Sequence, residues 1–224
     1  MKNQKIILLF FLILMGQYAT AQTEVKKPQD VFEMFFNTFL RRDQTSYIKL
    51  NNYLKPTADG QNVYSIDFTK NSDDNVAKTV AENFISEFPK ETASACKKEA
   101  EDFFKQVMIN FRDAKLTINK IQVVPNEFIE DQKIAKVNYT INFKIPKNIQ
   151  DIPTAPEKIK ADELKKYFSL LTNNLKNTNE TLSFEQEFDL YEIKEGNKIY
   201  YWNGDPYELF SAPFDFYFKQ LTAK

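Results

Sequence analysis

Hydrophobic residues recur at helical spacing through most of the first half of the chain. A first amphipathic helix is predicted from Asp30, a suitable N-cap, to the arginines that end its apolar stripe at residues 41–42. Its apolar residues follow the i, i+3, i+4, i+7, i+8 rule: Phe32, Phe35, Phe36, Phe39 and Leu40. A second, shorter helix is predicted over residues 44–54, which Lys55-Pro56 ends.

Two more helices are predicted after a short strand at residues 64–68, where apolar and polar side chains alternate. The polar run 71–75 precedes one helix, whose predicted inward residues stand four apart until Pro89 breaks the pattern: Val76, Val80, Phe84 and Phe88. The next helix carries another apolar stripe: Cys96, Ala100, Phe103, Val107 and Phe111.

From residue 116 the hydrophobic period changes to two, which is typical of strands. Strands are predicted over 116–124, with a slip in phase near Lys120, and over 135–145, where the alternation is unbroken. A capping box at 154–157 predicts a helix that runs to about residue 176. Strands then return at 182–193 and 199–202, joined by a turn at 195–197. The aromatic tail is expected to pack back onto the body.

These patterns predict an α+β fold, in which N-terminal helices pack on a curved antiparallel sheet and a helical insertion lies near 146–181. With 42% hydrophobic residues the chain has enough apolar surface for a core, so disorder is excluded. We expect one domain over 30–224, preceded by a polar leader at 22–29.

The first 21 residues have the three parts of a secretory signal peptide. Lys2 and Lys5 are basic, residues 6–15 are apolar, and residues 19–21 form a small-x-small cleavage signal. Ten apolar residues rise about 15 Å along a helix, half of a ~30 Å hydrocarbon core, which disfavours an uncleaved anchor. We therefore expect export to the periplasm or the extracellular space, a mature chain that starts at Gln22, and no membrane span in it.

Charge and composition exclude several classes of function. The chain has 30 basic residues, two of them in the signal peptide, so cleavage leaves 28 against 31 acidic ones, a net charge of −3. The two signs are interspersed, which argues against a nucleic-acid partner. The absence of histidine excludes histidine-based nucleophile systems and an ordinary zinc site, and four scattered glycines cannot form a phosphate-binding loop. We expect no cofactor, no metal and no catalytic residue.

Two short motifs are open to a chemical or a structural interpretation. Ser46–Lys49 and Ser94–Lys97 have the S-x-x-K spacing of serine nucleophiles, but the companion motifs are missing and chance spacing is favoured. The run from Asn71 to Glu82 places oxygen donors where a calcium loop needs them, but Val76 stands where that loop needs glycine. A helix-capping role is therefore favoured.

Two segments resemble the nuclear-transport-factor-2-like superfamily of α+β cones, which includes SnoaL-like domains. Residues 31–54, VFEMFFNTFLRRDQTSYIKLNNYL, look like that family's first two helices, and residues 184–202, FEQEFDLYEIKEGNKIYYW, are similar to its last hairpin. The resemblance extends over about residues 30–204. The lysine- and asparagine-rich composition is also similar to that of proteins exported by Bacteroidota.

Because family members open a cavity between the sheet and the first helices, the resemblance implies a ligand pocket. Six aromatic residues are its predicted lining: Phe36, Tyr139, Phe143, Phe188, Tyr200 and Trp202. These rings equally suit a filled core. The leading hypothesis is an exported, non-enzymatic binding or interaction domain for a small apolar ligand or a protein partner. The alternatives are a SnoaL-like enzyme with carboxylate and tyrosine acid–base chemistry, and an envelope immunity protein that blocks a toxin.

Overall fold

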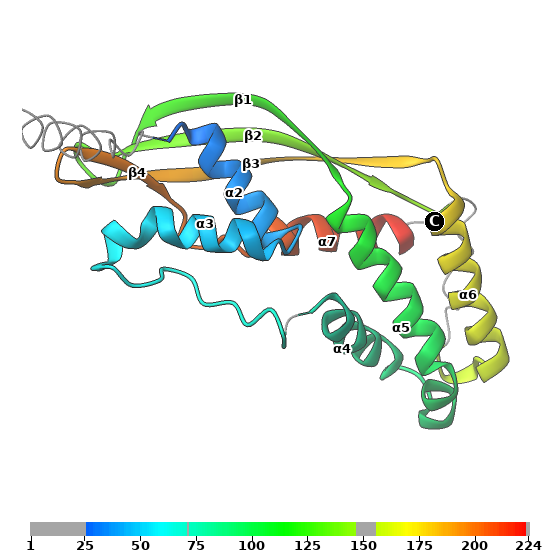
Figure 1. The fold of residues 1–224 in the computed structure, drawn as a ribbon. Coiled ribbons are helices and arrows are strands. Elements are labelled where there is room, and N and C mark those ends of the chain that lie inside the picture. The colour runs from blue at the N-terminus through cyan, green and yellow to red at the C-terminus, as the bar shows by residue number, and fades with distance from the viewer. Residues whose placement is uncertain (1–25, 71, 147–155, 223–224) are drawn as a thin grey trace, which may run out of the picture.

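The structure, a computed structural model, describes residues 26–70, 72–146 and 156–222. In these ranges it contains six α-helices and one four-stranded antiparallel sheet of order β1-β2-β3-β4. The sheet is curved and unclosed, and helices pack against it (Figure 1). The predicted α+β class is confirmed. The predicted signal peptide and the first two residues of the predicted capping box lie outside the described residues.

The strands form a simple meander. They are β1 (Lys115–Pro125), β2 (Lys133–Lys144), β3 (Thr181–Glu195) and β4 (Lys198–Trp202). The predicted slip in phase is confirmed as a register shift between Ile118 and Lys120, and the alternation of β2 is confirmed by its burial pattern. The β3–β4 hairpin turns at Gly196, whose φ of 59° suits glycine.

The first helix begins earlier than predicted. Helix α2 (Pro28–Phe39) begins inside the predicted leader, because the fixed φ of a proline suits a first helical turn. Asp30 is therefore in the first turn and not at the N-cap. Helix α3 (Gln44–Leu54) is capped by Asp43, whose side chain accepts from the backbone N–H groups of Thr45 and Ser46, and a short 3₁₀ helix follows at Lys55–Ala58.

The strand predicted over 64–68 is wrong, because this segment is an extended loop. The Asn51 side chain provides the hydrogen bonds that a neighbouring strand would supply. Its Oδ1 accepts from Tyr64 N at 2.9 Å and its Nδ2 donates to Tyr64 O at 3.1 Å. The Tyr47 hydroxyl donates to the same carbonyl. The backbone of Tyr64 is thus satisfied without a sheet partner.

Helix α4 (Asp73–Ile85) packs with a different face from the one predicted, although Phe88, the last of the predicted inward residues, is buried just after the helix. Its buried residues are Ala77, Ala81 and Ile85, while Val76, Val80 and Phe84 lie on the flank and are half-buried. Small alanines let α4 lie close to α5 (Lys90–Arg112). The stripe predicted for α5 is confirmed, and Cys96 is completely buried on it.

Helix α6 (Ala161–Asn177) starts later than predicted, after a 3₁₀ turn at Pro156–Lys158. Its first turn is closed by Glu163, whose carboxylate accepts from Lys160 N at 3.3 Å. Its buried apolar residues include four at helical spacing: Leu164, Phe168, Leu171 and Leu175.

The tail forms α7 (Glu208–Thr222), which packs back as expected and buries Tyr217 and Leu221. Figure 1 shows α4, α5 and α6 extending as a group from one end of the sheet, whereas α2 and α3 lie against the other. Among the described residues, no helix combines the length and the hydropathy needed to cross a membrane.

Candidate functional site

Three of the six predicted pocket residues meet between α2 and the sheet. The ring centroid of Phe32 lies 4.9 Å from that of Tyr139, 5.7 Å from that of Phe188 and 6.2 Å from that of Phe36. All four side chains are at most 2% exposed. Here the rings pack against one another.

The other three residues lie elsewhere. Phe143 stacks on Phe111 of α5 at 4.6 Å, and Tyr200 lies 5.4 Å from Tyr53 of α3. Trp202 is on the last strand and half-buried against the core, and its ring covers Gly204. The six residues therefore do not line one common space. Their role in ligand binding stays a prediction.

Gln186, the one polar residue in the inward series of β3 between Leu182 and Leu190, has a structural explanation. Its Oε1 accepts from the Tyr139 hydroxyl at 3.2 Å, and its Nε2 donates to the Glu208 carboxylate at 2.7 Å. The amide thus links a buried phenol to the first turn of α7. Burial raises the pKa of Tyr139 far above its ordinary value, so this phenol stays protonated.

A tyrosine–carboxylate pair of the kind that the enzyme alternative requires exists on β3 and β4. The Tyr201 hydroxyl donates to Glu192 Oε1 at 3.2 Å, and both residues are buried. Desolvation, and then the negative charge of Glu192, raise the pKa of Tyr201 to about 12. A general base needs a pKa near the working pH, so this phenol is poorly suited to accept a proton at neutral pH.

The Ser94–Lys97 motif and the calcium-loop pattern have structural roles. Lys97 Nζ lies 2.7 Å from Glu82 Oε1, so this amine pairs with a carboxylate on the neighbouring helix. Of the calcium-loop positions, Asn71 lies outside the described residues, and Asp73 pairs with Arg42 and Arg112. The expected capping is confirmed, because the Ser72 side chain accepts from Asn75 N. In the described ranges, no cluster of three or more acidic, Cys or His side chains could hold a metal ion.

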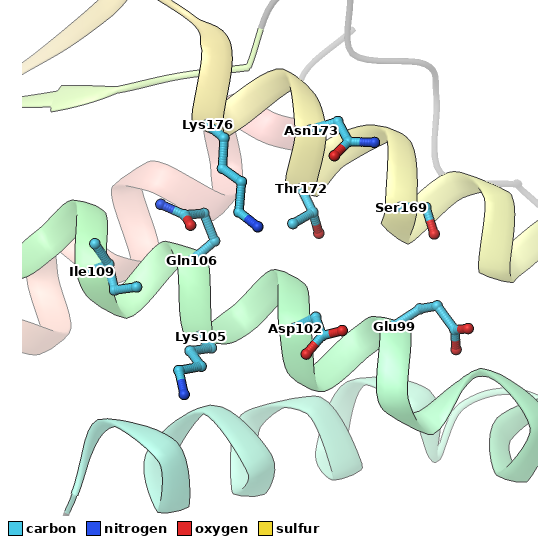
Figure 2. A pocket seen from close by; sticks show the side chains of 9 residues that line it. All are labelled: Glu99, Asp102, Lys105, Gln106, Ile109, Ser169, Thr172, Asn173 and Lys176. Atoms are coloured by element: carbon cyan, nitrogen blue, oxygen red, sulfur yellow. The ribbon is translucent and has the colours of Figure 1, made fainter.

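A polar groove runs between α5 and α6 and has a volume of about 410 Å³. Figure 2 shows carboxylates, hydroxyls and amides from the two helices along it. Two of its charged groups have partners outside the groove: Lys105 pairs with Asp74 of α4, and Asp102 pairs with Lys98 one turn earlier. A second hollow of about 310 Å³ continues from it towards the end of the sheet. The mixed polar lining of both hollows suits water and selects no ligand class.

A second groove is mainly apolar and has a volume of about 510 Å³. It lies between α4 and α7, with Phe104 of α5 beneath, and we call it the aromatic groove. Its lining consists of Val80, Asn83, Phe84, Glu87, Phe104, Phe214, Asp215, Phe218 and Lys219.

The loop between β1 and β2, residues 126–132, projects an apolar pair into solvent, and we call it the hairpin tip. Phe128 is 93% exposed and Ile129 is 53% exposed. Three acidic residues stand beside this pair: Glu127, Glu130 and Asp131. All five side chains belong to a loop of seven residues.

Hydrogen bonds fix the backbone of the hairpin tip. Asn126 Oδ1 accepts from Phe128 N at 2.9 Å, Asn126 N donates to Gln132 O at 2.8 Å, and the Asn126 and Gln132 side chains bond to each other. Gln132 Nε2 also donates to Glu192 O, and Lys194 Nζ donates to Asp131 O, which ties the tip to β3. The tip is therefore ordered by its own polar groups while Phe128 has no apolar cover.

Sequence reasoning did not identify the hairpin tip. The available signal was an aromatic–aliphatic pair inside an acidic turn between two strands, where apolar side chains have no core to join. It also assigned Phe84 to the interior, whereas this ring lines the aromatic groove.

No family model, no curated protein and no solved structure matches the chain. The geometry of the described residues is therefore the basis for the function proposed below.

Proposed function

We propose that this chain is an exported, non-enzymatic interaction domain that binds a protein partner through the hairpin tip. The observation that carries the proposal is Phe128, a phenylalanine with 93% of its surface exposed on a loop that hydrogen bonds hold in place.

Exposure of a single apolar side chain is common, but this tip has two adjacent ones and a fixed backbone. Full burial of a phenylalanine in a partner's pocket would contribute about 1.5–3 kcal/mol. Because the loop is already ordered, binding would lose little backbone entropy, and more of that gain would appear as affinity. Aromatic residues are also enriched in the buried centres of protein interfaces.

The surroundings of the tip favour a partner with basic groups. Glu127, Glu130 and Asp131 would face the rim of the pocket that receives Phe128. Such charges act mainly on the association rate and on the choice of partner. An envelope immunity protein would belong to this class of interaction domain.

Two features favour binding over catalysis. The aromatic residues between α2 and the sheet pack closely against one another, and burial raises the pKa of Tyr201 to about 12, so this phenol is protonated at neutral pH. The signal-peptide pattern at residues 1–21 supports export.

A photo-cross-linking amino acid at position 128 tests the proposal in the cells that make the protein. The matched control carries the same group at Ile48 of α3, which is 51% exposed but lies away from the tip. We expect a discrete cross-linked protein from position 128 and none of that mass from position 48. If position 128 gives only uncross-linked chain, or if both positions give the same set of products, the tip is not the binding surface.

A further inference from the structure

The aromatic groove is a different surface from the hairpin tip, and its walls come from two helices. One wall is formed by Val80, Asn83 and Phe84 on one face of α4 and by Glu87 in the turn that follows the helix. The facing wall of α7 has two aromatic and two charged residues: Phe214, Asp215, Phe218 and Lys219.

The groove follows from how α4 packs. The fully buried residues of this helix are Ala77, Ala81 and Ile85, whereas its bulkier Val80 and Phe84 are only partly buried at the edge of the core. Four aromatic rings contact one another in a continuous row along the groove. Phe84 lies 5.8 Å from Phe104, Phe104 lies 5.7 Å from Phe218, and Phe218 lies 4.6 Å from Phe214.

The chemistry of the lining selects for charge as well as for apolar character. Aromatic rings present a negative face that attracts cations. Glu87 and Asp215 add two carboxylates, and neither forms an ion pair in the described part of the chain. Together with the single ammonium group of Lys219, the lining has a net charge of −1.

We propose that the aromatic groove binds a hydrophobic cation, an aryl- or alkylammonium group whose apolar part lies on the rings and whose charge faces Glu87 and Asp215. The volume of about 510 Å³ suits a small molecule of this kind. A carboxylate ligand would instead meet two like charges, and a neutral ligand would gain only from apolar contact.

Three probes that share one skeleton separate these contributions: 4-phenylbutylammonium, 4-phenylbutanol and 4-phenylbutyrate. Binding to the native protein is measured by calorimetry and by saturation-transfer NMR at low salt. We expect the ammonium probe to bind about three- to tenfold more tightly than the alcohol, because cation–π attraction and exposed carboxylates are each modest in water. The carboxylate probe should be the weakest of the three.

Two double variants locate the preference. In E87Q/D215N the ammonium probe should fall to the affinity of the alcohol, whereas the alcohol itself should be unchanged. The matched control E127Q/E130Q, which removes two carboxylates from the hairpin tip, should leave all three affinities unchanged. Equal affinity for the three probes, no binding of any of them, or a cation preference that survives in E87Q/D215N would overturn the proposal. None of these results depends on the role of the hairpin tip.

Discussion

Substitution of Phe188 by alanine tests whether the space between α2 and the sheet is filled. Phe188 is 2% exposed, and its ring lies 5.7 Å from that of Phe32 and 5.6 Å from that of Phe35. It also stands opposite Val137 on β2. Removal of a ring from such surroundings leaves a cavity, because neighbours on a helix and a sheet can close in only partly. We expect Phe188→Ala to lower the free energy of unfolding by ~3–5 kcal/mol.

The assay is urea denaturation followed by the fluorescence of Trp202, the single tryptophan of the chain. The matched control is Phe128→Ala, the same change at a side chain that is 93% exposed, which should alter the free energy of unfolding by less than about 0.5 kcal/mol. A loss below about 1 kcal/mol for Phe188→Ala would refute the reasoning, since truncation in a packed core costs more than this. It would instead indicate a hollow interior, as the cone pocket requires.

Three further predictions concern the N-terminus, one turn and the buried phenols. Mass spectrometry of exported protein should give a chain that starts at Gln22; a retained N-terminus would contradict the signal-peptide prediction. Gly204→Ala should shift the emission maximum of Trp202 and lower stability by about 1–2 kcal/mol, because the new Cβ would lie 2.9 Å from the indole Cη2; an unchanged spectrum would contradict this contact. Burial raises the pKa of Tyr53 and of Tyr201 from 10.0 to about 12, so their contribution to stability is present below pH 10 and is lost as the pH rises towards 12. Denaturation measured across that window should show the decrease, and a flat profile would argue against buried phenols.

Elements with a regular two-residue period were predicted well. In such a strand the apolar residues on one face and the polar residues on the other both indicate which side chains point inward. On β2, the residues from Ala135 to Phe143 alternate without a break, and every predicted inward residue between them is buried. The slip near Lys120 was also visible, because a bulge displaces the apolar series by one position.

Long-range contacts decided what the sequence could not predict. The alternation at 64–68 resembles a strand, but Asn51, thirteen residues before Tyr64, takes its backbone hydrogen bonds. On α4, hydrophobicity favoured the face with Val80 and Phe84, whereas the structure buries the smaller Ala77 and Ala81 most deeply. The local pattern reports apolar character, but it reveals neither the partner of a backbone hydrogen bond, as at Tyr64, nor the size of the neighbouring space, as at α4.

The candidate surfaces could not be predicted either, because the sequence does not show which apolar side chains are exposed. Phe128 and Phe188 are the same residue type, and only the tertiary structure shows that one is 93% exposed and the other 2% exposed. The order of the hairpin tip likewise depends on bonds from Asn126 and Gln132 that no periodicity reveals.

Backbone ¹⁵N relaxation of the isolated protein tests the central claim most directly, because the proposed function requires the hairpin tip to be ordered before any partner binds. Residues 127–131 should have order parameters near those of β2, about 0.85, since their hydrogen bonds to Asn126, Gln132 and β3 restrict the loop. Values below about 0.6 at these positions, with β2 still rigid, would contradict it: Phe128 would then move freely on a flexible loop and would not be a preformed contact for a partner.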